Sequence, residues 1–185
     1  MRLPVLTLLA VWSASVAASG PHVDESTGLA TWQVETRGIQ LRLTQISPNQ
    51  VRGFYQARGF PAAAANEYAR ECIFMTVVRN VGDMPLEHRL SDWHYVVAGH
   101  APQAIRSKAE WDARWTRLGV TEGARIAFTW AQFPTEQTFA PGDWNQGMTA
   151  FSAPRESSFD LHFIWRIGDT RYSDVLKEIH CAKDA

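Results

Sequence analysis

Apolar and polar residues alternate along two neighbouring segments near the start of the chain, at 31–35 and 39–43. A period of two residues is typical of a half-buried β-strand, whose side chains point to opposite faces in turn. Arg37 and Gly38 lie between the two segments and suit a turn. We therefore expect a pair of strands here.

Later segments predict further strands. Residues 72–79 are apolar on both faces and rich in β-branched side chains, as in the central strand of a sheet. The cleanest alternation lies in 159–166 and 171–181, which are joined by a hairpin turn at Gly168 and Asp169. Less regular strands are expected at 85–97, 125–133 and 148–153.

Helical periodicity interrupts the strands twice. A serine-proline pair at 47–48 combines an N-cap with a proline in the first turn, and it begins a helical hairpin at about 48–70. Ser107 and Glu110 have the spacing of a capping box and begin a helix at about 108–118.

About eight short strands with turns between them and two helical insertions predict a mostly β fold. An antiparallel β-sandwich explains this order better than alternating βαβ units do. Internal repeats and linkers are absent from the sequence, so we expect residues 20–185 to form a single domain.

Three turn motifs of this sequence resemble those of a known class of domains. Residues 80–86 have the pattern N-x-G-x-x-P-L, residues 141–143 form a P-G-D turn, and Phe151 precedes Pro154 in an F-x-x-P pattern. Together they resemble immunoglobulin-like accessory domains of exported bacterial proteins. The resemblance implies an immunoglobulin-like β-sandwich with a binding or accessory role, and it brings no catalytic residues with it.

The N-terminal segment resembles none of these strands. Arg2 is followed by an apolar stretch from 3 to 16 and then by small residues, which is the pattern of a secretory signal peptide over 1–19. The apolar stretch is shorter than the roughly 20 residues that span a bilayer as a helix. We expect a periplasmic or secreted protein without a membrane span.

The net charge of the chain gives no support for two classes of partner, nucleic acids and anionic membranes. The chain has 18 Lys and Arg residues and 19 Asp and Glu residues. Loss of 1–19 removes Arg2 alone, which leaves 17 basic against 19 acidic residues and a net charge near −2. So small a charge gives no electrostatic reason to expect binding to nucleic acid or to an anionic membrane.

Cys72 and Cys181 are the two cysteines of the chain. In an exported protein the first expectation is one structural disulfide between them, which would tie the C-terminal strand to a central strand. Their separation excludes a closely spaced C-x-x-C motif. Reactive thiols, metal-bound thiols and unpaired buried thiols are the alternatives.

Histidines suggest a metal site. His88 and His94 are six residues apart and share a face if their strand is regular, and Met84 and His100 are nearby in the sequence. Imidazole and thioether ligands suit copper, and imidazole also suits zinc. The alternative is that all four are solvated strand and loop residues.

Partner binding has two candidate regions. Arg52, Arg58 and Phe60 belong to a repeated Arg-Gly-Phe triplet in the helical hairpin, and arginine and aromatic residues are common in protein interfaces. Trp144 follows the P-G-D turn among amide and carboxylate side chains. The alternatives are that Phe60 anchors the hairpin and that Trp144 folds back into the core.

The sequence contains no nucleophile elbow, phosphate-binding loop, zinc-protease motif or dinucleotide fingerprint. We therefore expect a non-catalytic binding or accessory protein that acts on a partner protein in the periplasm. A periplasmic copper- or zinc-binding protein is the first alternative, and an enzyme of an unrecognised family is the second.

Overall fold

The computed structural model describes residues 20–155 and 157–184. The predicted signal peptide at 1–19 lies outside the described residues. None of the helices in the described part of the chain combines the length and the hydrophobicity that a membrane span requires.

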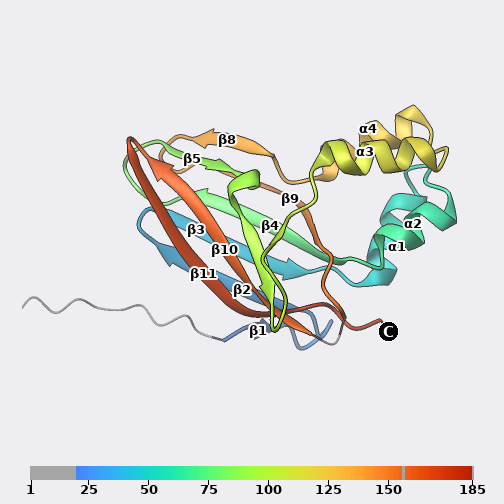
Figure 1. Ribbon diagram of the computed structural model, residues 1–185, viewed down its shortest axis with the longest axis horizontal. Coiled ribbons are helices and arrows are strands. Elements are labelled where there is room, and N and C mark those ends of the chain that lie inside the picture. Colours follow the sequence, from blue (N-terminus) through green and yellow to red (C-terminus); the bar gives the residue numbers. More distant parts are fainter. Residues whose placement is uncertain (1–19, 156, 185) are drawn as a thin grey trace, which may run out of the picture.

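The first sheet has five antiparallel strands in the order β1-β2-β3-β4-β9 (Figure 1). The expected pair near residue 37 is confirmed, because Trp32 lies opposite Leu43 in neighbouring strands. The expected central strand is confirmed as β4, which pairs on one edge with β3 and on the other with β9. The bounds are β1 His22–Val23, β2 Ala30–Thr36, β3 Ile39–Gln45, β4 Cys72–Asn80 and β9 Trp144–Phe151.

The second sheet has six antiparallel strands in the order β7-β6-β10-β5-β8, with β11 paired to β10. The predicted C-terminal hairpin is confirmed, since β10 and β11 pair along nearly their whole length. The bounds are β5 Leu86–Arg89, β6 His94–Val97, β7 Gln103–Ala104, β8 Glu136–Phe139, β10 Ser158–Ile167 and β11 Thr170–His180.

The main core lies between the two sheets and follows from the alternation in their strands. The first sheet supplies Trp32 and Phe74, and the second supplies Phe159 and Phe163, all of them buried. The rings of Trp32 and Phe74 meet edge to face with centroids 6.0 Å apart. Burying rings of this size is the largest favourable contribution that these strands make to folding.

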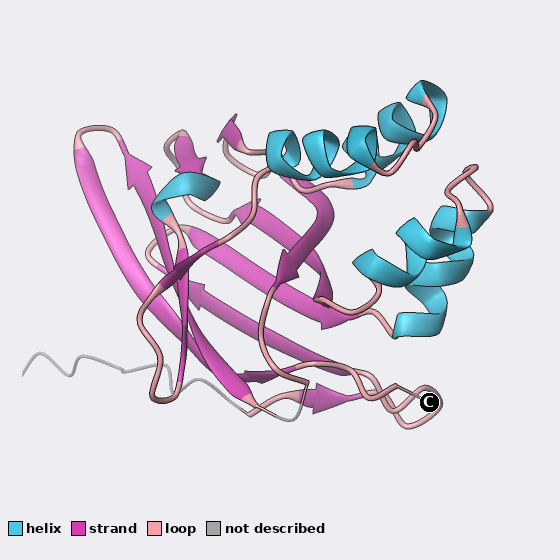
Figure 2. Cartoon of the chain, turned by 45° about the vertical axis from the view of Figure 1, so that its right-hand side comes forward, coloured by secondary structure: helices cyan, strands magenta, loops and turns pink. Residues whose placement is uncertain are grey.

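The helices gather at one end of the strands and enclose a second hydrophobic core (Figures 1 and 2). Both predicted capping signals are confirmed: Ser47 and Gln50 form a capping box, and so do Ser107 and Glu110. The bounds are α1 Pro48–Gln56, α2 Ala62–Tyr68, α3 Lys108–Arg117 and α4 Glu122–Ala131.

The strand expected at 125–133 is wrong, because residues 125–131 belong to α4. Ile126, Phe128 and Trp130 do alternate with smaller residues, which produced the prediction. Burial instead follows a helical period: Ala124 and Phe128 are buried four residues apart. The helix begins at Thr121, whose side chain accepts a hydrogen bond from the backbone N–H of Ala124.

The strand expected at 85–97 is interrupted. β11 pairs along the whole of β10, so β5 and β6 share the other edge of β10, where His88 lies opposite Trp165 and His94 opposite His162. Between these two pairs β10 advances by three residues, from His162 to Trp165. The segment that contains β5 and β6 advances by six residues, from His88 to His94. The three extra residues form a short 3₁₀ turn, Leu90–Asp92. An odd number of extra residues moves His88 and His94 to opposite faces of the sheet.

Asn80 joins the turns at the end opposite the helices. Its side-chain amide donates hydrogen bonds to the carbonyl groups of Met84 and Phe139, at 2.8 and 3.0 Å. Its side-chain oxygen accepts from the N–H of Gly82 at 3.0 Å. The asparagine of the N-x-G-x-x-P-L turn is therefore buried, and its hydrogen bonds hold neighbouring loops together.

Cys72 and Cys181 form the predicted disulfide, with their Cα atoms 4.9 Å apart. Cys72 begins β4 of the first sheet and Cys181 follows β11 of the second, so the bond ties the two sheets together. The fold is thus mixed α and β: two antiparallel sheets form a sandwich, and the described residues contain four α-helices, of which α4 was not expected from the sequence.

Candidate functional site

The hairpin of α3 and α4 is held by aromatic packing on its inner side. Trp111 and Trp115 stack with ring centroids 5.0 Å apart, and both rings contact Phe128 of α4. Tyr68 of α2 meets Trp111 edge to face at 4.9 Å. One face of α4 is therefore fixed against the helical core, and its other face is left to solvent.

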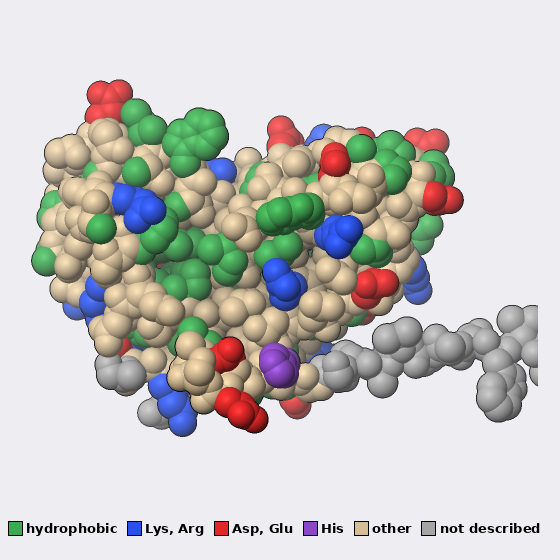
Figure 3. Space-filling view, turned by 180° about the vertical axis from the view of Figure 1, so that it is seen from behind, with side chains coloured by type: hydrophobic (Ala, Val, Ile, Leu, Met, Phe, Trp, Pro, Cys, Tyr) green, Lys and Arg blue, Asp and Glu red, His purple; other side chains and the backbone are tan. Residues whose placement is uncertain are grey.

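The outer face of α4 presents two large apolar side chains one helical turn apart. Trp130 is 85% exposed and Ile126 is 51% exposed. Figure 3 shows hydrophobic side chains on the surface of the helical end, with others spread over the rest of this face. A tryptophan this exposed keeps most of its apolar surface in water, which is unusual for the largest hydrophobic side chain.

A groove of about 360 Å³ runs beside these side chains. We call it the α4 groove, and it is lined by Asp112, Glu122, Arg125, Ile126, Thr129 and Trp130. Nη1 of Arg125 donates to both carboxylate oxygens of Asp112, at 2.9 and 3.0 Å, and to the hydroxyl of Thr116 at 2.7 Å. The groove thus combines an apolar wall with a polar wall whose side chains are already oriented.

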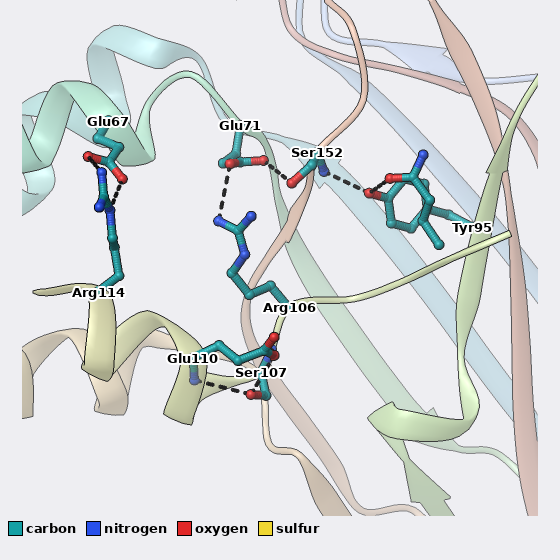
Figure 4. Close-up of polar contacts among 9 residues, drawn as sticks. Glu67, Glu71, Tyr95, Arg106, Ser107, Glu110, Arg114 and Ser152 are labelled. Carbon is teal, nitrogen blue, oxygen red and sulfur yellow. Dashed lines mark hydrogen bonds and ion pairs between the residues drawn. The ribbon is translucent and has the colours of Figure 1, made fainter. Parts of the chain in front are cut away.

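Polar contacts join the helices to one another and to the sandwich (Figure 4). Arg114 of α3 forms a two-pronged ion pair with Glu67 of α2, at 2.5 and 2.9 Å. Glu71 accepts from the hydroxyl of Ser152 at 2.6 Å and pairs with Arg106 at 3.5 Å. These contacts fix the orientation of the helical end, and with it the orientation of the α4 groove.

The same network reaches into the second sheet through Tyr95 of β6. Its hydroxyl accepts from the backbone N–H of Ser152 at 3.1 Å and donates to the side chain of Gln103 at 2.9 Å (Figure 4). Burial raises the pKa of Tyr95, so its hydroxyl stays protonated at neutral pH. We assign these contacts to attachment of the helices, since each polar group already has a partner within the protein.

A second polar chain lies beneath α4. The hydroxyl of Tyr68 donates to the side-chain oxygen of Gln132 at 2.9 Å, and the amide of Gln132 donates to the hydroxyl of Tyr55 at 2.8 Å. Burial raises the pKa of both tyrosines, which keeps them neutral. The chain of hydrogen bonds explains how a glutamine is buried at the end of α4.

Comparison with protein-family models, with curated proteins and with solved structures finds no match to this chain. Its function therefore has to be inferred from the chemistry of its own surfaces. The α4 groove combines exposed aromatic area with oriented polar groups.

The partner-binding residues expected in the helical hairpin do not form one surface. Phe60 is buried against Tyr55 and Trp115 in the helical core. Arg58 lies over the ring of Phe54 at 3.4 Å. Arg52 pairs with Asp184 at 3.2 Å. Each of these side chains is occupied by contacts within the protein.

Trp144, the remaining candidate, is 58% exposed at the start of β9 and lies opposite Arg79 of β4. It does not fold back into the core. Trp130 and Ile126 were missed because their segment was expected to be a strand. The sequence signal that could have identified them is the four-residue spacing of Ala124 and Phe128 after Thr121, a suitable N-cap, which places Ile126 and Trp130 on the other face of a helix.

The expected metal ligands are dispersed. His88 is buried and faces the rings of Trp93, Phe133 and Phe139. Within 20–155 and 157–184, no three His, Cys, Asp or Glu side chains gather as a metal site. Met84 is exposed next to a turn, His100 is exposed beyond β6, and His94 faces His162 instead of His88.

His88 gives a prediction for the dependence of stability on pH. Burial lowers the pKa of His88 from 6.5 to about 4, and neither of its ring nitrogens has a hydrogen-bond partner among the described residues. Between these two values the unfolded chain binds a proton that the native state rejects, so stability falls as the pH falls. We expect the free energy of unfolding to drop by about 2 kcal/mol between about pH 7.5 and pH 5 through this group.

Urea unfolding of the wild type and of His88→Leu at both pH values measures this contribution. Leucine has a similar size and does not titrate, so the variant should lose less stability on acidification by roughly the same 2 kcal/mol. Other titrating groups are common to the two proteins and cancel in the comparison. Equal losses in the two proteins would mean that His88 is not the group responsible.

Proposed function

We propose that this chain is a non-catalytic binding or accessory protein of the periplasm, and that its α4 groove docks onto a partner protein. The observation that carries the proposal is Trp130, which is 85% exposed on a helix whose other face is firmly packed. An immunoglobulin-like arrangement of the sandwich, as the turn motifs suggest, would serve as its rigid scaffold. The internal disulfide agrees with an oxidising compartment.

The composition of the α4 groove resembles the centre of a protein interface. Tryptophan and arginine are enriched among the residues that contribute most to protein–protein affinity, and polar groups surround them at the rim. Here Trp130 and Ile126 supply the apolar centre, and Arg125 with Asp112 supplies a rim that is already ordered. Because Arg125 and Asp112 are held by their mutual ion pair before binding, ordering them costs little conformational entropy on association.

Charge narrows the chemistry of the partner. Asp112 is neutralised by Arg125, whereas Glu122 has no ion pair or hydrogen bond among the described residues. A basic side chain of the partner would complement Glu122 and orient the complex. The partner surface should therefore offer an apolar pocket for the indole of Trp130 with a lysine or arginine at its edge.

Site-specific photo-crosslinking in the exported protein tests this surface directly. A crosslinking residue replaces Ile126 in one variant and Val23 of β1 in another, because the two side chains are 51% and 50% exposed. We expect a discrete crosslinked protein from position 126 and none from position 23. Equal crosslinking at the two positions would contradict docking at the α4 groove.

The affinity of the identified partner then measures the role of Trp130. Trp130→Ala should raise the Kd by roughly 30-fold, since a central tryptophan contributes about 2 kcal/mol or more. Trp144→Ala is the matched control, because it removes an exposed tryptophan from another element. Unchanged affinity of Trp130→Ala would overturn the assignment, and turnover of any substrate that a point mutation abolishes would overturn the non-catalytic role.

A further inference from the structure

His94 and His162, which we call the histidine pair, lie directly opposite each other on β6 and β10. Their rings are stacked, with centroids 4.6 Å apart and planes inclined by 8°. The neighbours Tyr95 and Leu161 are buried in the main core, so alternation along the strands turns the histidine pair outward. Two imidazoles from separate strands thus meet on the outer face of the second sheet.

The ring nitrogens of the histidine pair are free to act as ligands. Neither imidazole forms a hydrogen bond or ion pair with the described residues, and both side chains are partly exposed.

We propose that the histidine pair binds one divalent transition-metal ion, with Cu²⁺ bound more tightly than Zn²⁺. Imidazole nitrogen suits both ions, and in sites of this kind Cu²⁺ binds more strongly than Zn²⁺. In the stacked arrangement the nitrogen lone pairs lie in nearly parallel planes, so to share one ion the rings turn about their side-chain bonds until one nitrogen of each lies about 2.0 Å from it. Partial exposure leaves room for this rotation.

Asp160 lies two residues before His162, on the same face of β10. One of its carboxylate oxygens accepts the backbone N–H of Glu178 at 2.9 Å, which holds the side chain in place. This carboxylate is therefore held by the neighbouring strand, and water completes the coordination, in agreement with the absence of a three-residue metal cluster among the described residues. The site shares no residue with the α4 groove, so it stands independently of the proposed docking function.

Titration of untagged exported protein with Cu²⁺ and, separately, with Zn²⁺ near neutral pH tests the proposal. We expect one ion per chain, with tighter binding of Cu²⁺ and nitrogen hyperfine coupling in its electron paramagnetic resonance spectrum. His94→Ala and His162→Ala should each weaken binding by about tenfold or more, because each removes a direct ligand. His100→Ala is the matched control, since it removes an exposed histidine outside the pair.

Folding of each variant is checked by circular dichroism, and His94→Gln and His162→Gln serve where alanine disturbs the sheet. In the wild type, Cu²⁺ should broaden the imidazole resonances of His94 and His162 together at substoichiometric metal. Stoichiometric binding that survives in the double variant, or binding lost only in His100→Ala, would overturn the proposal. So would the absence of any stoichiometric binding to the wild type.

Discussion

Replacing Cys72 and Cys181 together by alanine should lower the free energy of unfolding by about 4 to 5 kcal/mol. The disulfide closes a loop of 109 residues, and its loss frees the unfolded chain from that restriction. The bond also connects the start of β4 with the end of β11, so the native state loses a direct link between its two sheets. A loss of this size is a large share of the stability of an ordinary domain.

Urea unfolding of the wild type, the double variant and the reduced wild type measures this contribution. The double variant and the reduced wild type should agree, because both remove the same covalent link. A loss of less than about 1 kcal/mol would contradict the chain-entropy argument. The bond should also resist reductant in the folded protein, since Cys72 and Cys181 are only 1% and 6% exposed.

The part of the fold that sequence predicts best has strict alternation and local turns. The hairpin of β10 and β11 was predicted because its apolar positions repeat every second residue and Gly168 marks its turn. The capping boxes at Ser47 and Ser107 were predicted because they depend on residues three positions apart. Such signals are contained in a few neighbouring residues, which is why one sequence suffices to find them.

α4 shows where local alternation fails. Ile126, Phe128 and Trp130 fit the period of a strand as well as part of a helix. The choice depends on packing against Trp111 and Trp115, which no local pattern records. Tertiary contacts decide between a strand and a helix where the local preference for both is similar. The wrong choice here concealed Trp130, the most exposed tryptophan among the described residues.

The histidines show a second limit, set by register. His88 and His94 share a face only in a regular strand, and the 3₁₀ turn at Leu90–Asp92 adds three residues between them. The residue that lies beside His94 is His162 and not His88. His162 is almost seventy residues further along the chain than His94 and lies directly opposite it on the neighbouring strand. Strand pairing of this kind follows from topology, which the pattern of one strand does not contain.

Gly147→Ala should destabilise the protein by about 3 kcal/mol, the second largest effect that we expect. Gly147 is buried in β9, and β9 passes so close to the end of α4 that Met148 and Gln132 form a bridge. A Cβ atom at 147 would lie 2.5 Å from the carbonyl carbon of Gln132 and 2.5 Å from Cα of Phe133, and it would also clash with the backbone nitrogen of Phe133. These are backbone atoms, so relief requires β9 and the end of α4 to separate.

Gly123→Ala is the matched control, because a Cβ atom there meets no other atom within 4 Å. Gly123 lies in the first turn of α4, and alanine should stabilise that helix by about 0.5 kcal/mol. Thermal or urea unfolding of the two variants should therefore shift in opposite directions.

Because the strain in Gly147→Ala acts where the strand supports the helix, that variant should also weaken partner binding at the α4 groove. A stability of Gly147→Ala equal to that of the wild type would show that the close approach of β9 to α4 is not required by the fold.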